Sequence, residues 1–286
     1  MANMAQAGTQ QNIGILHPGA MGAGVAEQAV GTGAAVWWLP EGRSAASVRR
    51  AAAAGLRGVG SLAELAEGCE LILSICPPAA ALEVARSVAK TGFAGIYLDA
   101  NAISPAHALE IAEVFGPTEA SVVDGGIVGG PPRRPGTRLY LSGEQAAAVE
   151  TVRALFAPTV LEPIVLPGPV GRASALKLSF AAFNKISYAL AAQSYALAEG
   201  HGVLDELLSL AADVVPGTVL ARPEQVVTAG PRAWRWGPEM DEIAAACSGV
   251  AIPGDLAAAA SLLFARWAGL KDADGVRIED LIEGLR

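Results

Sequence analysis

Short apolar runs alternate with longer amphipathic stretches through the first half of the chain. The apolar runs predict strands at residues 12–16, 35–39, 71–75, 96–99 and 121–124. The stretches between them predict helices at residues 21–30, 44–54, 62–67, 79–90 and 105–115. Residues 138–142 and 160–166 are candidates to extend the sheet. Apolar strands that alternate with helices indicate an α/β fold, a doubly wound parallel sheet with helices on both faces.

The pattern changes after Gly168. From Arg172 to Glu199 the chain contains neither Pro nor Gly, which predicts one helix of about 42 Å. Helical periodicity continues to the end. We therefore expect a tail at 1–11, an α/β domain at 12–166 and an all-α C-terminal domain at 167–286, built on the long central helix. Such a helix has more apolar surface than this domain can cover, which predicts a homodimer through the second domain.

Charge and composition narrow the class of protein. The net charge is −8, and no dense basic stripe is present, so nucleic acid is not an expected partner. No run reaches the ~18 apolar residues of a membrane span. The first eleven residues lack the basic and apolar regions of a secretory signal. The 3 cysteines have no metal-ligand spacing. We expect a cytoplasmic protein that binds neither a metal nor a membrane.

A glycine-containing turn joins the first predicted strand to the first predicted helix. The segment Ile13–Gly22 compares with the dinucleotide fingerprint G-x-G-x-x-G, with His17 at the first glycine position and Gly19 and Gly22 at the other two. Gly19 lets the backbone approach a pyrophosphate, and the helix start offers N–H donors. The expected cofactor contacts here are His17, Pro18, Gly19, Ala20, Met21 and Gly22. The alternative is a tight turn without a ligand.

The residues after the second strand indicate which dinucleotide binds. Glu41 lies about 20 residues past the glycines, where an acid would bind a ribose hydroxyl. Arg43 and Ser44 follow it at once, and Arg with Ser suits a 2′-phosphate. We therefore favour NADP(H) over NAD(H) and name Glu41, Arg43 and Ser44 as cofactor residues. The alternative for Arg43 is a solvated loop cation.

Five segments together resemble the β-hydroxyacid dehydrogenases, which are related to 6-phosphogluconate dehydrogenase and the imine reductases. The turn Gly19–Gly22 is similar to the family's G-x-M-G. The other similar segments are Leu98–Pro105, Asp124–Gly130, Gly168–Lys177, and Glu239–Ala246 with the downstream Pro253. The resemblance covers nearly the whole chain and extends to a subgroup of uncharacterised NAD(P)-dependent oxidoreductases with a distinctive C-terminal domain. It implies that 12–166 is an NAD(P)-binding Rossmann domain and 167–286 a substrate and dimerisation domain.

Three positions depart from the family pattern. Val128 stands where the family has a substrate-binding Ser, Ala181 where it has an Asn, and Asp241 where it has a Lys. Their joint replacement disfavours a small hydroxyacid as substrate. The resemblance places the substrate at Asn101, Val128, Gly129, Gly130 and Asp241, and Trp236 is expected to line an apolar substrate pocket. Further cofactor contacts are expected at Cys76 and Pro77, which follow the fourth predicted strand, and at Asn101. For Trp236, packing of the second domain is the alternative.

Lys177 is the expected general acid or base. Asn184 and Tyr188 fall within about 20° of its direction around the predicted helix, so one face carries all three candidate catalytic residues. A reductase needs a proton donor beside the carbon that receives hydride, and Lys or Tyr can serve. The alternatives are an exposed cation for Lys177 and core or dimer packing for Tyr188.

These patterns predict an NADP(H)-dependent oxidoreductase that transfers a hydride between the nicotinamide and a carbonyl or hydroxyl carbon of a small molecule. Reduction of a C=N bond is the second enzymatic hypothesis, since it fits the weakened carboxylate-binding pattern. A non-catalytic NADP-binding sensor is the third, and the presence of Lys177 disfavours it.

Overall fold

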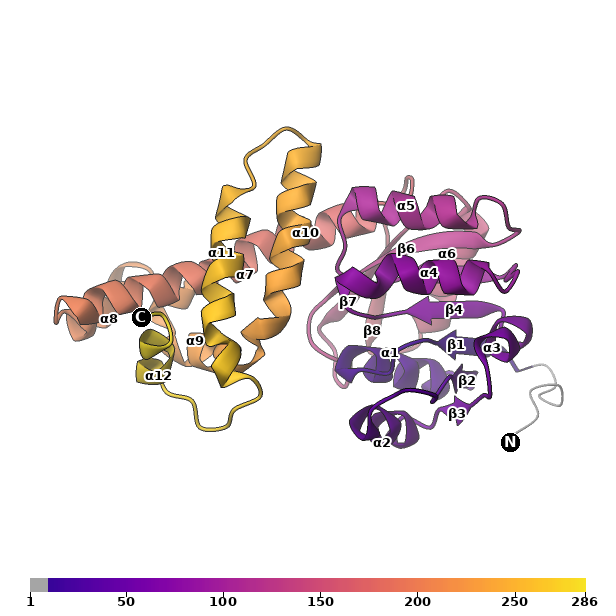
Figure 1. Ribbon diagram of the computed structural model, residues 1–286, viewed down its shortest axis with the longest axis horizontal. Coiled ribbons are helices and arrows are strands. Elements are labelled where there is room, and N and C mark those ends of the chain that lie inside the picture. Colours follow the sequence, from indigo (N-terminus) through magenta and orange to yellow (C-terminus); the bar gives the residue numbers. More distant parts are fainter. Residues whose placement is uncertain (1–9) are drawn as a thin grey trace. The chain divides into compact units, whose positions relative to one another are not determined.

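The computed structural model describes residues 10–286, so that most of the predicted tail at 1–11 lies outside the described residues. The chain divides into two compact units, Met1–Lys177 and Leu178–Arg286. The first unit is an α/β structure and the second is helical (Figure 1). The division falls within one long helix, past the boundary at Leu166 that the sequence suggests.

An eight-stranded sheet forms the centre of the first unit, in the order β3-β2-β1-β4-β5-β6-β7-β8. The strands are β1 (Asn12–Ile15), β2 (Ala35–Trp38), β3 (Arg57–Gly58), β4 (Leu71–Ser74), β5 (Ile96–Asp99), β6 (Ser121–Val128), β7 (Thr137–Ser142) and β8 (Leu161–Val165). The predicted Rossmann fold is confirmed, and β7 and β8 do extend the sheet. Only β6 and β7 pair antiparallel among the paired strands. Their short connection has no room for the crossover that parallel pairing needs.

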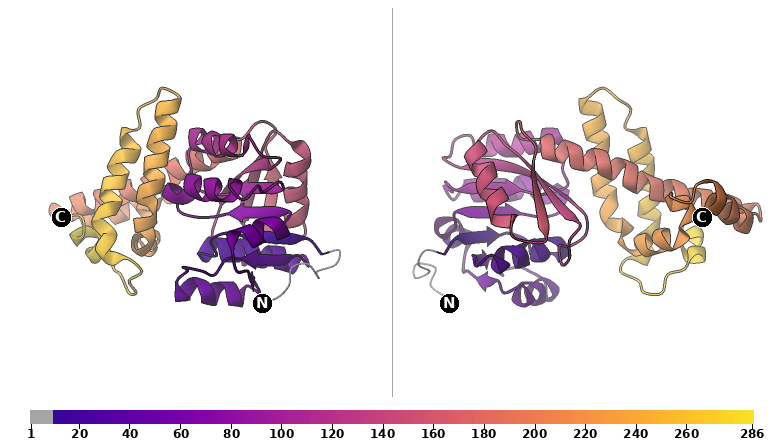
Figure 2. Two further views of the ribbon diagram at one scale, coloured as in Figure 1. Left: turned by 45° about the vertical axis from the view of Figure 1, so that its right-hand side comes forward. Right: turned by 180° about the vertical axis from the view of Figure 1, so that it is seen from behind.

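Helices cover both faces of this sheet (Figure 2). They are α1 (Ala20–Gly31), α2 (Ala45–Ala53), α3 (Leu62–Gly68), η2 (Pro78–Ala80), α4 (Ala81–Ala89), α5 (Pro105–Phe115) and α6 (Ala146–Phe156). Two apolar clusters result, one that joins the strands to α1, α2 and α6, and one that joins them to α3, α4 and α5. Neighbouring side chains on a strand enter opposite clusters, as Leu71 and Ile72 do. This two-sided burial explains why the strands are apolar throughout.

The second unit contains most of α7 and the helices that follow it. They are α7 (Arg172–Gly200), α8 (Leu204–Val214), η3 (Val219–Ala221), α9 (Pro223–Ala229), η4 (Gly230–Arg235), α10 (Trp236–Gly249), α11 (Asp255–Arg266), η5 (Trp267–Leu270) and α12 (Ile278–Glu283). Its core includes Tyr195, Phe264 and Trp267, all fully buried. The Tyr195 hydroxyl donates to the carbonyl oxygen of Leu220 at 2.8 Å. The range of α7 confirms the long helix that the sequence predicts from Arg172 to Glu199. Within residues 10–286, no helix is long and apolar enough to cross a membrane.

Candidate functional site

The turn between β1 and α1 has the shape that the two glycines predict. A side chain at Gly22 would place its Cβ 2.3 Å from the carbonyl oxygen of His17, so only glycine fits there. At Gly19 the added Cβ would meet no atom within 4 Å, which leaves the backbone open to a ligand. Gly19 is the N-cap of α1 in an extended conformation, and no side chain caps this helix. The first N–H groups of α1 thus form an uncapped, electropositive helix start.

His17 and Arg43 face this turn with buried nitrogen atoms that have no hydrogen-bond partner among the described residues. These atoms are His17 Nδ1 and Arg43 Nε. Burial, and then the charge of Arg43, lower the pKa of His17 to about 4, so this imidazole is neutral at neutral pH. Unsatisfied buried nitrogens are uncommon and call for an acceptor. A dinucleotide phosphate is an acceptor of suitable charge, so these residues fit such a cofactor.

Helix α2 begins just after Arg43 and is hydrogen-bonded to the glycine turn. Ser44 is its N-cap and accepts a hydrogen bond from Ser47 N at 3.2 Å. Arg50 donates to the carbonyl oxygen of Pro18 at 3.2 Å and to Ser47 Oγ at 3.2 Å, so it ties the glycine turn to α2. Glu41 is exposed. The structure thus places Arg43 and Ser44 beside the turn, and it adds Arg50, which the sequence pattern did not single out.

A buried polar network lies where β4 and β5 end. Asn101 is 2% exposed, and its side-chain amide donates to Asp99 Oδ2 at 2.7 Å and to Ser74 Oγ at 3.2 Å. Its Oδ1 accepts from Cys76 N at 2.5 Å. Both donor hydrogens of Asn101 are therefore used inside the protein. Its predicted contacts with cofactor and substrate remain predictions. One lone pair of Asn101 Oδ1 is the part of the side chain that remains to accept a hydrogen bond from a ligand.

Two further predicted cofactor residues, Cys76 and Pro77, follow β4. Burial, and then the charge of Asp99, raise the pKa of the Cys76 thiol to about 12, which makes it a poor nucleophile. Pro77 is exposed and precedes η2. Cys76 thus suits the role of a small neutral residue near a ligand, as the sequence suggests.

Asp99 and Asp124 are paired neighbours on β5 and β6, and both are buried. Burial is the main cause that raises the pKa of Asp99 to about 7, and the charge of Asp124 adds to it, against hydrogen bonds from Asn101 that lower it. One carboxyl of this pair thus titrates near neutral pH. Asp124, in contrast, is surrounded by hydrogen-bond donors from the start of α7.

Lys177 lies in the second turn of α7, against β6. A side chain at Gly126 would place its Cβ 2.6 Å from the carbonyl oxygen of Ala173 and 3.1 Å from Lys177 Cβ. Glycine at 126 therefore lets α7 approach the sheet closely. The Lys177 backbone is held at the carboxyl half of β6, two residues before Val128, where the strand ends.

Gly129 and Gly130 begin the exposed turn after Val128. Gly129 has φ of +124°, and an added Cβ would lie 2.9 Å from Thr137 Cα. Thr137 Oγ1 donates to the carbonyl oxygen of Gly130 at 2.7 Å. Gly129 is thus required by the turn itself, whereas an added Cβ at Gly130 would meet no atom within 4 Å, and a substrate contact by either glycine remains a prediction. The rest of the turn lies on α1, where Gln28 Nε2 donates to the carbonyl oxygen of Pro132 at 2.8 Å.

The second unit brings other candidate residues together. Lys185 on α7 forms a hydrogen-bonded ion pair with Glu239 on α10, and both side chains are nearly buried. The ring of Trp236 lies 5.5 Å from the Lys185 ammonium and 5.5 Å from the ring of Tyr188. Trp236 and Tyr188 are therefore part of an aromatic cluster in this core, as their alternative role predicted. Sequence spacing gave no signal for the Lys185–Glu239 pair.

Asn184 and Asp241 are the remaining candidate residues of the second unit. Asn184 is half-buried on α7, three turns of helix before Tyr195. Asp241 is exposed on α10, at a pocket of about 280 Å³ that Trp234 and Phe264 also line. Their proposed contacts with substrate remain predictions.

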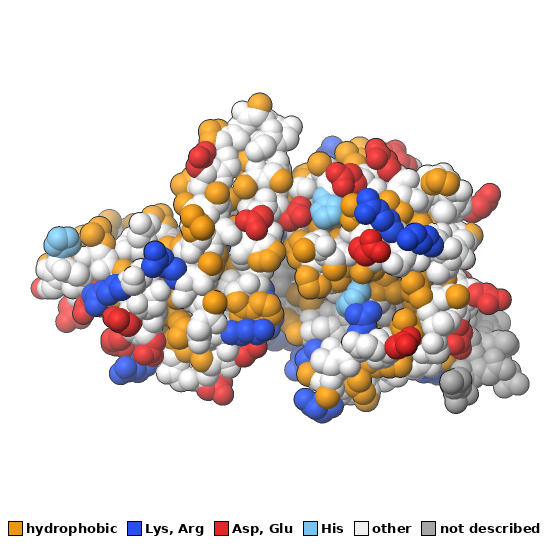
Figure 3. Space-filling model, in the orientation of Figure 1, with side chains coloured by type: hydrophobic (Ala, Val, Ile, Leu, Met, Phe, Trp, Pro, Cys, Tyr) orange, Lys and Arg blue, Asp and Glu red, His pale blue; other side chains and the backbone are white. Residues whose placement is uncertain are grey.

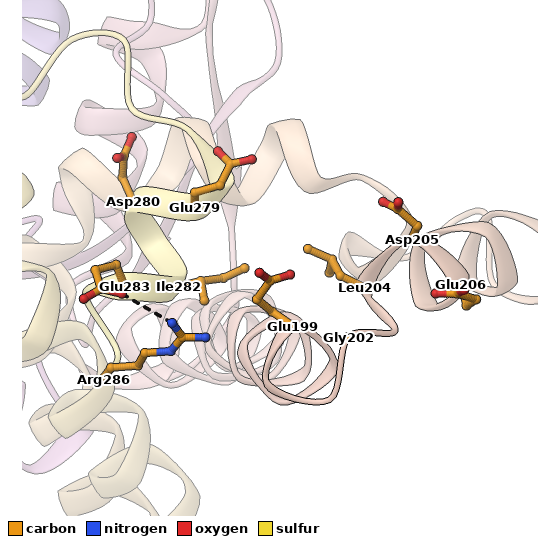
Figure 4. Close-up of a pocket in the computed structure, with 10 residues that line it drawn as sticks. All are labelled: Glu199, Gly202, Leu204, Asp205, Glu206, Glu279, Asp280, Ile282, Glu283 and Arg286. Carbon is orange, nitrogen blue, oxygen red and sulfur yellow. Dashed lines mark hydrogen bonds and ion pairs between the residues drawn. The ribbon is translucent and has the colours of Figure 1, made fainter.

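A separate acidic pocket of about 560 Å³ lies in the second unit (Figure 4). Most of the side chains that line it are carboxylates, with Arg286 and Glu283 joined by an ion pair. Such a surface repels phosphate. In the described part of the chain, no group of three His, Cys, Asp or Glu could hold a metal ion. Acidic and basic side chains are interspersed on the face shown in Figure 3.

Family models match a segment in each part of the chain. Residues 12–160 match the family described as the NAD binding domain of 6-phosphogluconate dehydrogenase. Residues 198–267 match a domain family of unknown function. An uncharacterised 28.5 kDa protein of Methanothermus fervidus is 27% identical over 170 residues, which are 59% of this chain and 64% of that protein.

Solved structures share the fold. A 3-hydroxyisobutyrate dehydrogenase of Mycobacterium tuberculosis, solved with L-serine, has a TM-score of 0.75 at 18% identity and covers 97% of this chain and 100% of its own. A reductive aminase of Aspergillus terreus, in complex with NADPH4, cyclohexanone and allyl amine, has a TM-score of 0.58 at 20% identity, with the same coverage of 97% and 100%. The turn at Gly19 and Gly22, the doubly wound sheet and the match over residues 12–160 agree: this chain belongs to the family of the NAD binding domain of 6-phosphogluconate dehydrogenase.

Proposed function

We propose that this protein is an NADP(H)-dependent oxidoreductase acting on a carbonyl or hydroxyl carbon of a small molecule. The observation that carries the proposal is the uncapped start of α1 beside two unsatisfied nitrogens, His17 Nδ1 and Arg43 Nε. A helix start, a neutral donor and a guanidinium together favour a phosphorylated dinucleotide. The nicotinamide, when bound, supplies or accepts a hydride.

Arg43 and Ser44 are the residues that we assign to the 2′-phosphate. Ser44 Oγ accepts from Ser47 N and lies 3.2 Å from Ser47 Oγ, so two hydroxyl groups at the start of α2 are placed to bind phosphate oxygens. Arg50 holds the start of α2 to the glycine turn. Glu41 is exposed and can turn to solvent, so it need not repel the phosphate. These features support NADP(H) over NAD(H).

Lys177 is the residue that we assign to proton transfer. Hydride arrival at a carbonyl carbon leaves negative charge on its oxygen, and a Lys ammonium can donate the proton that neutralises it. In the reverse direction the neutral amine accepts the hydroxyl proton. Arg would not serve, because it stays protonated. The close approach of α7 to Gly126 holds the Lys177 backbone against the sheet that carries the cofactor turn. We place Asn184 and Tyr188 as orienting residues on the same helix.

Imine reduction is the second candidate function. Val128, Ala181 and Asp241 do not offer the carboxylate-binding groups that a small hydroxyacid needs. The similarity of fold to a reductive aminase solved with NADPH is consistent with this alternative.

We also propose a homodimer through the second unit. Phe183, Leu190 and Leu197 on α7 are 79%, 63% and 65% exposed, and two helical turns separate each from the next. Leu262 on α11 is 74% exposed and lines the same groove of about 710 Å³ as Leu190 and Leu197. An apolar stripe of this length supports burial against a second copy of the chain.

A panel of carbonyl and imine compounds tests the reaction class, with NADPH oxidation followed by absorbance. Lys177→Met should lower kcat by about 10²–10⁴, the usual scale for a general acid, with little change in NADPH affinity. Lys90→Met, at the C-cap of α4, is the matched control and should keep wild-type turnover. Near-normal turnover of Lys177→Met would refute the assignment of Lys177. No turnover of any compound by an enzyme that binds NADPH would favour a sensor.

A further inference from the structure

The start of α7 has a cap that comes from the sheet and not from the helix's own preceding residues. Asp124 on β6 is 1% exposed. Its Oδ2 accepts from Gly171 N at 2.9 Å and from Ser174 N at 3.0 Å, and its Oδ1 accepts from Ser174 Oγ at 2.6 Å. One buried carboxylate therefore accepts three hydrogen bonds at the start of α7, a position that favours negative charge.

Ser142 completes this cap from the neighbouring strand. It is the partner of Asp124 in the β6–β7 register. Its hydroxyl donates to Asp124 Oδ2 at 3.0 Å and accepts from Ala173 N at 3.0 Å. The buried charge is thus satisfied by hydrogen bonds and by the start of α7, an arrangement that tolerates little movement.

The geometry around this cap is closely restricted. Gly171 has φ of +98°, a conformation that favours glycine, and an added Cβ would lie 3.3 Å from the carbonyl oxygen of Pro105. Gly126, two residues after Asp124 on β6, closes the contact between the strand and α7. Lys177 follows Ser174 by three residues, about one turn.

We infer that Asp124, with Ser142 and Ser174, is a positioning device that sets the place of Lys177 and the charge in its surroundings. The effect of this device on catalysis rests on the proposed role of Lys177. The hydrogen-bonded cap itself does not depend on that role. The carboxylate fixes the first turn of α7 to β6 and β7, so the Lys177 backbone cannot shift along the sheet. The carboxylate is hydrogen-bonded to Ser174, one helical turn before Lys177, and a nearby negative charge favours the ammonium form of a lysine.

The small number of lysines allows a direct measurement without a substrate. Reductive methylation with carbon-13 formaldehyde labels Lys90, Lys177, Lys185 and Lys271, and single Lys→Arg variants assign the NMR signals. The Lys177 signal is then titrated with pH in the wild type and in Asp124→Asn and Ser174→Ala. Ser174→Ala removes one hydrogen bond and keeps the carboxylate, so it serves if Asp124→Asn does not fold.

In Asp124→Asn the Lys177 midpoint should fall by about half a pH unit or more, because a nearby negative charge is lost. In Ser174→Ala the NMR signal of Lys177 should broaden or shift. The signals of Lys90 and Lys271 should stay where they are in the wild type. Val152→Ala is the control for general loosening, since Val152 is fully buried in the same unit, on α6, outside this network. It should leave the Lys177 signal unchanged. An unchanged Lys177 signal in both test variants, or an equal change in Val152→Ala, would overturn the inference.

Turnover then separates the device from the proposed function. Where a substrate is found, Asp124→Asn and Ser174→Ala should lower kcat by about tenfold to a hundredfold with unchanged NADPH affinity. If Lys177→Met keeps its turnover while the NMR shifts occur, the proposed function fails and the positioning device stands. If Lys177→Met loses turnover and the NMR signals do not move, the device fails and the proposed function stands.

Discussion

Replacing Arg43 with Ala tests the preference for NADP(H) that the turn after β2 supports. Arg43 is half-buried, and its Nε has no hydrogen-bond partner among the described residues. A phosphate there would gain one charge-assisted hydrogen bond, which contributes about 1.5–3 kcal/mol. Since about 1.4 kcal/mol corresponds to a factor of ten, Arg43→Ala should weaken NADPH binding by about tenfold to a hundredfold.

Calorimetric titration of both dinucleotides measures the effect. The wild type should bind NADPH at least about tenfold more tightly than NADH, the scale of one such bond. Arg43→Ala should remove most of this difference and leave NADH affinity nearly unchanged. Arg49→Ala is the matched control, because Arg49 is an exposed arginine on α2, the helix that follows Arg43. Equal wild-type affinities for the two dinucleotides, or a preference for NADH, would show that Glu41 dominates and that the reasoning is wrong. An equal loss of both affinities in Arg43→Ala would refute the assignment of Arg43 to the 2′-phosphate.

Three further outcomes are expected. The pKa of Asp99 is raised from 3.8 to about 7, so the folded state binds more protons than the unfolded state, and the free energy of unfolding should fall by up to about 4 kcal/mol as pH rises across that range. Urea unfolding of Asp99→Asn should lose this pH dependence. A pH profile identical to that of the wild type would contradict the raised pKa of Asp99. Small 3-hydroxyacids such as 3-hydroxyisobutyrate should be poor substrates, since each lost carboxylate contact costs about 1.5–3 kcal/mol, and efficient turnover of one would refute this. Sedimentation should show a dimer that Leu190→Glu weakens and Leu109→Glu, on exposed α5 surface, does not; a wild-type monomer at micromolar concentration would exclude the dimer.

Local pattern was enough to predict most of the elements. The apolar runs at β1, β2, β4 and β5 lie between helices of the correct period, and strand burial on both faces makes such runs conspicuous. Strand β3 was missed, because its two exposed residues, Arg57 and Gly58, show no apolar pattern. Helix α6 was also left out, although its buried residues do recur at helical spacing.

Some residues of the candidate site could likewise be predicted from the sequence, and others could not. Gly19, Gly22, Arg43 and Lys177 were accessible from the sequence, because each belongs to a motif in which neighbours along the chain act together. Asn101 was predicted as a ligand contact, which stays a prediction, and the sequence did not show that its amide joins β4 to β5. No local pattern reports a hydrogen bond between residues that are distant in sequence.

By itself, the sequence determined the doubly wound sheet, the long helix α7 and the dinucleotide turn, because periodicity and glycine placement act over a few residues. Tertiary structure alone decided the partners of buried polar groups. Asp124 meets Ser174, 50 residues away, and Lys185 meets Glu239, 54 residues away. Such pairs form only when strands and helices are brought together, since desolvation makes each buried charge depend on whichever donor the fold places beside it.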